Sequence, residues 1–363
     1  MDDLNSRFGE ALALQQAERF REALEIYREI SDRVLTTNLA CNATACLMML
    51  GELDEALAWF RKAQGARPAH PAVLEASLQL GAALLAAGRY AEGWPLMEAR
   101  IALHPGAVPP MAAAIPEWMG EALAGRSILI WVEQGLGDQI MCVRFAEDLA
   151  ARGAQVTVAC RPSLVDLFAA MPSVTAAVPA ARGEVAVVGR HDFYTRYMSL
   201  PLRLGTTLET LSGSPYLRPP ADRLARGSGR TGIGVMWRTS ATGGNASAKT
   251  LPEDQAQRLL DLGAVSLQPE DTGVADFADT AAIIDQLDLV ISVDTSVAHL
   301  AGAMGKPCWT LLPATRPDWR WLADRADSPW YASMRLFRQR RAGDWASVID
   351  EVLAADPLSQ RRG

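Results

Sequence analysis

The chain has 363 residues, which is more than one hydrophobic core usually serves, so two or three domains are expected. Hydrophobic residues make up 49% and charged residues 21% of the sequence, as in a globular protein and unlike a disordered one. The net charge is −7 and the Lys and Arg residues are spread along the chain, which argues against a nucleic-acid partner.

The composition also argues against a membrane protein and a metal protein. Residues 1–10 are acidic and polar, and no apolar run approaches the roughly 18 residues that span a bilayer, so neither a signal peptide nor a transmembrane segment is expected. We therefore expect a cytoplasmic protein. Five cysteines without a C-x-x-C pair and four dispersed histidines predict neither a disulfide framework nor a protein-held metal.

The first hundred residues contain a threefold repeat. Segments that begin at positions 18, 51 and 88 share a small residue and a large apolar residue, at spacings of 33 and then 37 residues. The small residues are Ala23, Ala56 and Gly93. The pattern resembles the tetratricopeptide repeat, a helical hairpin in which the small residue lets two helices approach. We predict a tetratricopeptide domain over residues 1–106 whose concave surface binds a protein or peptide; a generic helical scaffold is the alternative.

A glycine-containing turn begins the next region, after a predicted linker at 107–124. The apolar run 127–132 leads into this turn, and an amphipathic helix to about residue 151 follows. The turn contains Gln134, Gly135, Gly137 and Asp138. Its two glycines permit left-handed backbone angles and close approach by a ligand. The G-x-G-x-x-G signature of nicotinamide enzymes is incomplete, so a dinucleotide oxidoreductase is disfavoured. Asp138 acts in catalysis, caps its helix, or does both.

Further strands lie on both sides of a polar, Arg- and Gly-rich segment at 219–232, which suits a hinge between two α/β halves. Strands are predicted at 156–159, 176–178 and 233–236, with a helix at 164–170, whereas 183–215 gives no clear pattern. Trp237 and Arg238 directly follow the third strand, Lys249 follows a glycine-containing loop, and Gln268 ends the next strand. Placed at a helix start, Lys249 would oppose the helix dipole, which favours a functional role over a solvated surface.

Residues 288–307 carry the strongest functional signal. The apolar run 289–293 stops at Asp294, Thr295 and Ser296, after which small apolar residues recur at helical spacing around His299. This pattern predicts a buried strand that leads into a helix. The unpaired N–H groups and the positive dipole end of such a helix bind a phosphate without a cationic side chain. An ordinary strand-helix unit, with Asp294 as cap and His299 in the core, is the alternative.

Together these segments resemble glycosyltransferase family 9, the heptosyltransferases, and their tetratricopeptide-fused bacterial relatives. The resemblance covers residues 115–355 and rests on EQGLGDQI from residue 133, Lys249 before Leu-Pro, Ser-Leu-Gln at 266–268, DTSVAH from residue 294, and Pro-Asp-Trp-Arg-Trp at 317–321. It implies an α + α/β chain, with the helical repeats followed by a GT-B fold of two Rossmann-like domains. The acceptor half would span 125–220, and the nucleotide-sugar donor half 228–355 with a closing C-terminal helix.

The resemblance implies a hexosyl- or heptosyltransferase of bacterial type. It would move a sugar from a nucleoside diphosphate to an acceptor hydroxyl of a protein, peptide or glycan, with inversion and without a metal or other cofactor. Asp138 would be the base, and Gln134, Gly135 and Gly137 would face the acceptor. The donor-binding residues would be Trp237, Arg238, Lys249, Gln268, Asp294, Thr295, Ser296 and His299. A non-catalytic repeat protein with a degenerate GT-B scaffold is the alternative, and a nucleotide-sugar epimerase of related fold is a third.

Overall fold

The structure is a computed structural model in which two compact units can be described. The described residues are 2–107, 111, 114–181, 184, 188–240, 245–315 and 318–360. The units are Met1–Gly106 and Ala107–Gly363. Part of the predicted linker, residues 108–110 and 112–113, lies outside the described residues. None of the helices in the described part of the chain combines the length and the apolar character that crossing a bilayer requires.

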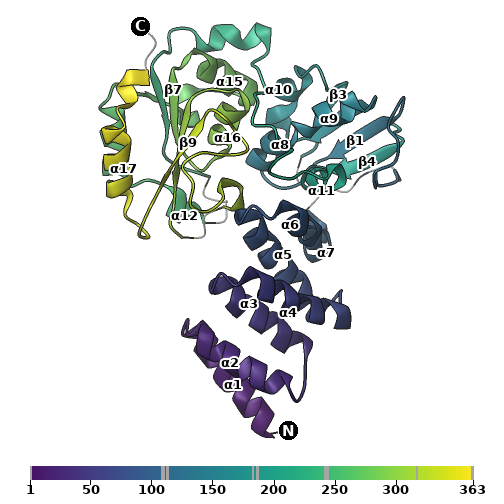
Figure 1. The fold of residues 1–363 in the computed structure, drawn as a ribbon. Helices are drawn as coiled ribbons and strands as arrows, with labels where there is room; N and C mark the ends of the chain where they lie inside the picture. Colours follow the sequence, from purple (N-terminus) through teal and green to yellow (C-terminus); the bar gives the residue numbers. More distant parts are fainter. Residues whose placement is uncertain are drawn as a thin grey trace. The chain divides into compact units, whose positions relative to one another are not determined.

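The first unit consists of helices that pack in consecutive pairs. The helices are α1 (Asp2–Gln16), α2 (Phe20–Ser31), α3 (Thr37–Met49), α4 (Leu53–Ala66), α5 (Pro71–Ala86), α6 (Tyr90–Met97) and α7 (Ala99–Leu103). Helix α1 packs on α2, α3 on α4, and α5 on α6 (Figure 1).

The small residues of the repeat lie where these helices meet. Ala23 and Ala56 are fully buried, and a Cβ added to Gly93 would lie 2.7 Å from Cγ of Leu85 on the preceding helix. A larger residue at these positions would push the helices apart, because interiors are close-packed. Paired helices with small contact residues are therefore confirmed, whereas the assignment of these pairs to the tetratricopeptide family stays a prediction.

The second unit begins with a four-stranded parallel sheet in the order β3-β2-β1-β4. Its strands are β1 (Ser127–Trp131), β2 (Gln155–Cys160), β3 (Ala176–Pro179) and β4 (Phe193–Arg196). The connecting helices are α8 (Leu136–Cys142), α9 (Phe145–Ala151), α10 (Val165–Ala169) and α11 (Leu200–Leu204). The single helix predicted to about residue 151 is therefore two short helices, and β4 lies in the segment to which the sequence assigned no element.

A five-stranded parallel sheet in the order β6-β5-β7-β8-β9 follows. Its strands are β5 (Ile233–Met236), β6 (Val265–Ser266), β7 (Leu289–Val293), β8 (Cys308–Leu312) and β9 (Met334–Arg338). Its helices are α12 (Ala246–Lys249), α13 (Glu253–Leu260), α14 (Pro269–Thr272), α15 (Phe277–Gln286), α16 (Ser296–Ala303) and α17 (Trp345–Ala354).

The central strand β7 explains why residues 289–293 are apolar at every position except Ser292. Helices α15 and α16 lie on one side of this strand and α17 lies on the other (Figure 1). Every residue of β7 is buried, and a parallel strand covered on both faces favours apolar side chains at all positions. The second unit thus has two parallel α/β halves, as a GT-B fold requires.

The two halves of the second unit are joined by a buried arginine and by the chain that crosses between them. Arg144, just before α9, donates hydrogen bonds to the carbonyl oxygens of Ser212 and Trp330 and lies 4.4 Å from the ring of Tyr216. The backbone N–H of Tyr216 donates to Ala303 at the end of α16 (2.9 Å). These contacts place the turn after β1 against the helix after β7, and α8 packs on α16.

Candidate functional site

The turn between β7 and α16 has the geometry of an anion site. Thr295 is the N-cap of α16, and its hydroxyl accepts a hydrogen bond from the N–H of Val297 (3.3 Å) and lies 3.0 Å from the hydroxyl of Ser292. Ser296 is the first helical residue and is half-buried. The other N–H groups of the first turn have no partner within the helix, and the dipole makes this end positive. A phosphate oxygen would be stabilised there.

Lys249 reaches this turn through an ion pair. Its Nζ lies 2.6 Å from Oδ2 of Asp294, which is buried. Burial raises the pKa of the Asp294 carboxyl, and the negative charge of Asp318 raises it further, against the opposing effect of Lys249. The Asp294 carboxyl therefore takes up a proton more readily than an exposed Asp carboxyl does.

The sequence argument from the helix dipole at Lys249 was wrong. Lys249 ends the short helix α12 and does not begin a helix, since α13 starts only at Glu253. A cation is favoured at a helix C-terminus, so the position of Lys249 in its helix is not unfavourable and gives no argument for a functional role. What brings Lys249 to the site is its ion pair with Asp294, a contact that the local sequence does not reveal.

Asp138 is both a helix cap and a partner of the other half. It is the third residue of α8, and its Oδ2 accepts a hydrogen bond from the N–H of Gly135 (2.9 Å). Its Oδ1 forms an ion pair with Arg320, which follows β8 in the donor half. Capping therefore does occur, and it leaves one carboxylate oxygen directed at the second half.

The expectation of left-handed glycines in this turn was wrong. The residue with a positive φ is Gln134, at 61°, whereas Gly135 has a φ of −84°. Gly137 is needed for a different reason, since a Cβ there would lie 2.8 Å from Cδ2 of His299. Gly137 thus permits close approach by His299 of the half that contains β5–β9, and not by a ligand as predicted.

His299 is a buried, neutral imidazole. Its Nδ1 lies 2.8 Å from the hydroxyl of Tyr331, and its ring stacks on Trp321 at a centroid distance of 5.1 Å. Burial lowers the pKa of His299 to about 3, and the positive charge of Arg320 acts in the same direction. The imidazole therefore carries no charge near neutral pH and offers hydrogen bonds only.

Arg320 is a residue of the site that the sequence analysis did not select. The segment 317–321 supported the resemblance only as a motif, and no role was assigned to Arg320. Arg320 is buried, and its Nη1 donates to both oxygens of Asp318 (2.7 and 2.9 Å) while Nη2 faces Asp138. The signal that could have found it is the pair of Asp and Arg two residues apart within an aromatic segment.

Trp237, Arg238 and Gln268 form a neighbouring group at the ends of β5 and β6. With its amide oriented to match its neighbours, buried Gln268 accepts hydrogen bonds from the N–H groups of Trp237 (3.2 Å) and Arg238 (3.0 Å). The Arg238 side chain is paired with exposed Glu270 and not with the β7 turn. Residues 241–244, which follow, lie outside the described residues.

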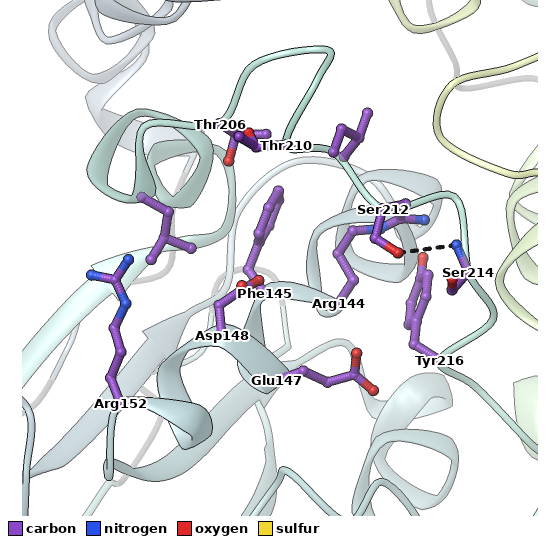
Figure 2. A pocket seen from close by; sticks show the side chains of 12 residues that line it. Arg144, Phe145, Glu147, Asp148, Arg152, Thr206, Thr210, Ser212, Ser214 and Tyr216 are labelled. Carbon is purple, nitrogen blue, oxygen red and sulfur yellow. Dashed lines mark hydrogen bonds between the residues drawn. The ribbon is translucent and has the colours of Figure 1, made fainter.

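A separate pocket of about 130 Å³ lies beside α9 in the acceptor half (Figure 2). Figure 2 shows Arg144 and Tyr216 on its wall, with the hydroxyl of Ser212 accepting a hydrogen bond from the N–H of Ser214 (3.2 Å). None of the residues predicted for the donor or acceptor site lines this pocket. Three of its residues, Arg144, Ser212 and Tyr216, also take part in the contacts that join the two halves.

Comparison with known families identifies the second half. Residues 223–340 match the family described as glycosyltransferase family 9 (heptosyltransferase). These residues therefore form a glycosyltransferase family 9 domain. The family 9 domain contains every donor-side residue predicted above and also Arg320, whereas Asp138 and its turn lie outside it.

Relatives of the whole chain are more distant. The chain is 27% identical over 359 residues to Protein FlbA of Caulobacter vibrioides, with 84% of this chain and 59% of FlbA covered, so it spans less than two thirds of that protein. A family 9 glycosyl transferase from Veillonella parvula matches with a TM-score of 0.44 at 13% identity, covering 65% of this chain and 91% of its own. ADP-heptose LPS heptosyltransferase II of E. coli matches with a TM-score of 0.43 at 16% identity, covering 65% of this chain and 99% of its own. Likenesses of this size do not identify a donor or an acceptor.

The arrangement can bind an anion on one side and accept a proton on the other. Helix α16 and Lys249 offer positive charge to a phosphate, and Asp138 is a carboxylate on the facing half. Among the residues that the structure describes, no group of three or more His, Cys, Asp or Glu side chains is placed to hold a metal ion.

Replacing Gly137 with Ala is expected to destabilise the second unit by roughly 1–2 kcal/mol, after the gain in helix propensity. The added Cβ would overlap the His299 ring, which Tyr331 and Trp321 hold in place. Urea denaturation measures the loss, and Gly189→Ala, where nothing lies within 4 Å, is the control. In a His299→Ala background the cost of Gly137→Ala should shrink. An equal cost in both backgrounds would show that the contact does not constrain the turn.

The lowered pKa of His299 is expected to make the folded protein less stable in mild acid. The unfolded chain binds a proton at this residue below a pKa of about 6.5, whereas the folded chain does so only near 3. The contribution is thus fully present above pH 6.5 and decreases as pH falls, by up to about 2 kcal/mol between pH 6.5 and 5. Denaturation at both pH values should show a smaller loss for His299→Gln than for the wild type. Equal losses would contradict a depressed pKa.

Proposed function

We propose that this chain is a GT-B glycosyltransferase that moves a hexosyl or heptosyl group from a nucleoside-diphosphate sugar to an acceptor hydroxyl. The family 9 domain supports glycosyltransferase activity and hence a nucleotide-sugar donor. One observation carries the rest of the proposal: the Asp138 turn of one half meets the Lys249–Asp294 pair and the start of α16 through the contact of Gly137 with His299. An anion site and a carboxylate base thus face each other.

In the proposed reaction the donor diphosphate binds at the start of α16 and at Lys249. The acceptor oxygen forms a bond to the anomeric carbon while the bond from that carbon to the diphosphate breaks, and the electron pair leaves with the diphosphate. Asp138 takes the hydroxyl proton as general base. The helix dipole and the Lys249 ammonium stabilise the charge that develops on the leaving group. Base and leaving group lie on opposite sides of the sugar, which gives inversion, and no metal ion takes part.

Neutral His299 would orient the substrates without titrating. Its ring is fixed by Tyr331 and Trp321, and the edge that carries Nε2 faces Gly137 at the boundary of the two halves. Near neutral pH it can exchange hydrogen bonds with a sugar or phosphate oxygen and adds no charge. Trp237, Arg238 and Gln268 would contact the nucleoside from the ends of β5 and β6.

We further propose that the helix pairs of residues 1–106 are tetratricopeptide repeats and that their surface binds a protein or peptide acceptor in the cytoplasm. A second candidate is a non-catalytic repeat protein with an inactive GT-B scaffold. The observation in its favour is that Lys249 and Arg320 are each paired with a carboxylate. The two candidates differ in nucleotide binding, since only a working donor site requires it.

Nucleoside diphosphates are expected to raise the melting temperature of the wild type, because a ligand of the folded state stabilises it. UDP, GDP, ADP, CDP and TDP would be compared by thermal shift. Lys249→Met should weaken binding by about tenfold or more, since it removes a charge-assisted contact to phosphate. Lys62→Met, an exposed lysine of the first unit, is the charge-matched control. If none of the five nucleotides binds, the scaffold is inactive.

Asp138→Asn is expected to lower the rate of sugar transfer by about 10² to 10⁴, as for the loss of a general base. The fold should be kept, because the amide oxygen of Asn can still accept the hydrogen bond from Gly135 and Arg320 stays paired with Asp318. The rate is measured as release of nucleoside diphosphate from the donor sugar of the nucleotide that binds. Asp138→Ala provides the comparison, since it loses both cap and base. Normal turnover in Asp138→Asn would limit this residue to a structural role.

A further inference from the structure

Arg320 is anchored to its own half and reaches the other half with a single nitrogen. Asp318 accepts two hydrogen bonds from Nη1, and the guanidinium lies 4.3 Å from the centre of the Trp319 ring. Only Nη2 crosses to Asp138. Nε has no hydrogen-bond partner among the described residues, although it is buried. The contact with Asp138 can therefore be exchanged while the anchor on Asp318 and Trp319 stays in place.

The charges around Arg320 do not favour a diphosphate unless a cation changes partner. Three carboxylates, Asp138, Asp294 and Asp318, are paired with two cations, Lys249 and Arg320. A diphosphate adds at least two negative charges to this cluster. Arginine is suited to bind these charges, because its planar guanidinium binds phosphate oxygens through parallel hydrogen bonds. Asp138 and a diphosphate would then compete for the same N–H group.

We propose that Arg320 is a second donor-binding cation, which passes from Asp138 to the diphosphate when the nucleotide sugar binds and thereby uncovers the base. This inference rests on the function proposed above. While Nη2 is bound to Oδ1 of Asp138, this oxygen is occupied and is not open to an acceptor hydroxyl. Once Nη2 contacts the diphosphate, Asp138 keeps only its cap to Gly135 and can accept the hydroxyl proton. Donor binding would thus precede activation of the acceptor.

Competition for one guanidinium predicts that loss of the base improves donor binding. Asn at position 138 is neutral and competes weakly for Arg320, so Asp138→Asn should bind a nucleoside diphosphate about tenfold more tightly than the wild type. Arg320→Met should bind about tenfold more weakly. The affinities of UDP, GDP, ADP, CDP and TDP are measured by titration calorimetry.

The double variant separates this exchange from a simple charge effect. Removing any nearby carboxylate reduces repulsion of a diphosphate, and such a gain would persist without Arg320. In an Arg320→Met background, Asp138→Asn is therefore expected to give no gain; a gain equal to that in the wild-type background overturns the proposal. Arg325→Met, which removes an arginine paired with exposed Asp327, is the charge-matched control and should bind like the wild type.

The remaining outcomes distinguish this inference from the proposed function. Binding that depends on Lys249 but is unchanged in Arg320→Met overturns the exchange alone. Absence of binding to the wild type and to every variant overturns the proposed function and this inference with it. If Arg320→Met does not fold, Arg320→Lys takes its place and should lose part of the affinity, because an ammonium keeps the charge without the planar fork. Unchanged affinity in both Arg320→Lys and Asp138→Asn also overturns the exchange.

Discussion

The contact of Gly137 with His299 is the constraint on which the rest of the site depends. Each residue lies in the first turn of a helix that follows a strand of its own parallel sheet, β1 for Gly137 and β7 for His299. Ligands bind at this edge in open α/β sheets. The His299 ring occupies the space in which a Cβ at position 137 would lie. The edges of the two sheets therefore meet closely at this point. This places Asp138 within reach of Arg320 and puts its carboxylate opposite the start of α16.

The site concentrates ion pairs at the boundary of the two halves, where stability alone would favour apolar residues. Buried pairs give little net stability, since the cost of removing charges from water offsets most of their attraction. Lys249 with Asp294 and Arg320 with Asp138 and Asp318 therefore add little to stability, which supports the donor site that we propose. Neutral His299 fits the same logic, because a third cation beside Arg320 would be repelled.

The local sequence predicted the strand-helix junctions of the second unit, whereas β8 and β9 were not predicted as strands. The apolar run 289–293 and the glycine turn before Asp138 gave the strand-helix junctions of both halves. Two physical arguments failed, because the left-handed residue is Gln134 and because Lys249 ends a helix. Strand β4 was not predicted, since its four residues Phe-Tyr-Thr-Arg give no clear alternation or apolar run and its pairing with β1 is long-range.

The sequence by itself predicted the helix pairs of the first unit and the strand-helix junctions of the second. Hydrophobic period, small residues and turn chemistry act over a few residues, so they can be read along the chain. Tertiary structure alone decided which charges meet. Asp138 and Arg320 lie 182 residues apart, and their pairing follows from the closing of one sheet edge on the other. A salt bridge of this kind leaves no local pattern, because its cause is the packing of two complete domains.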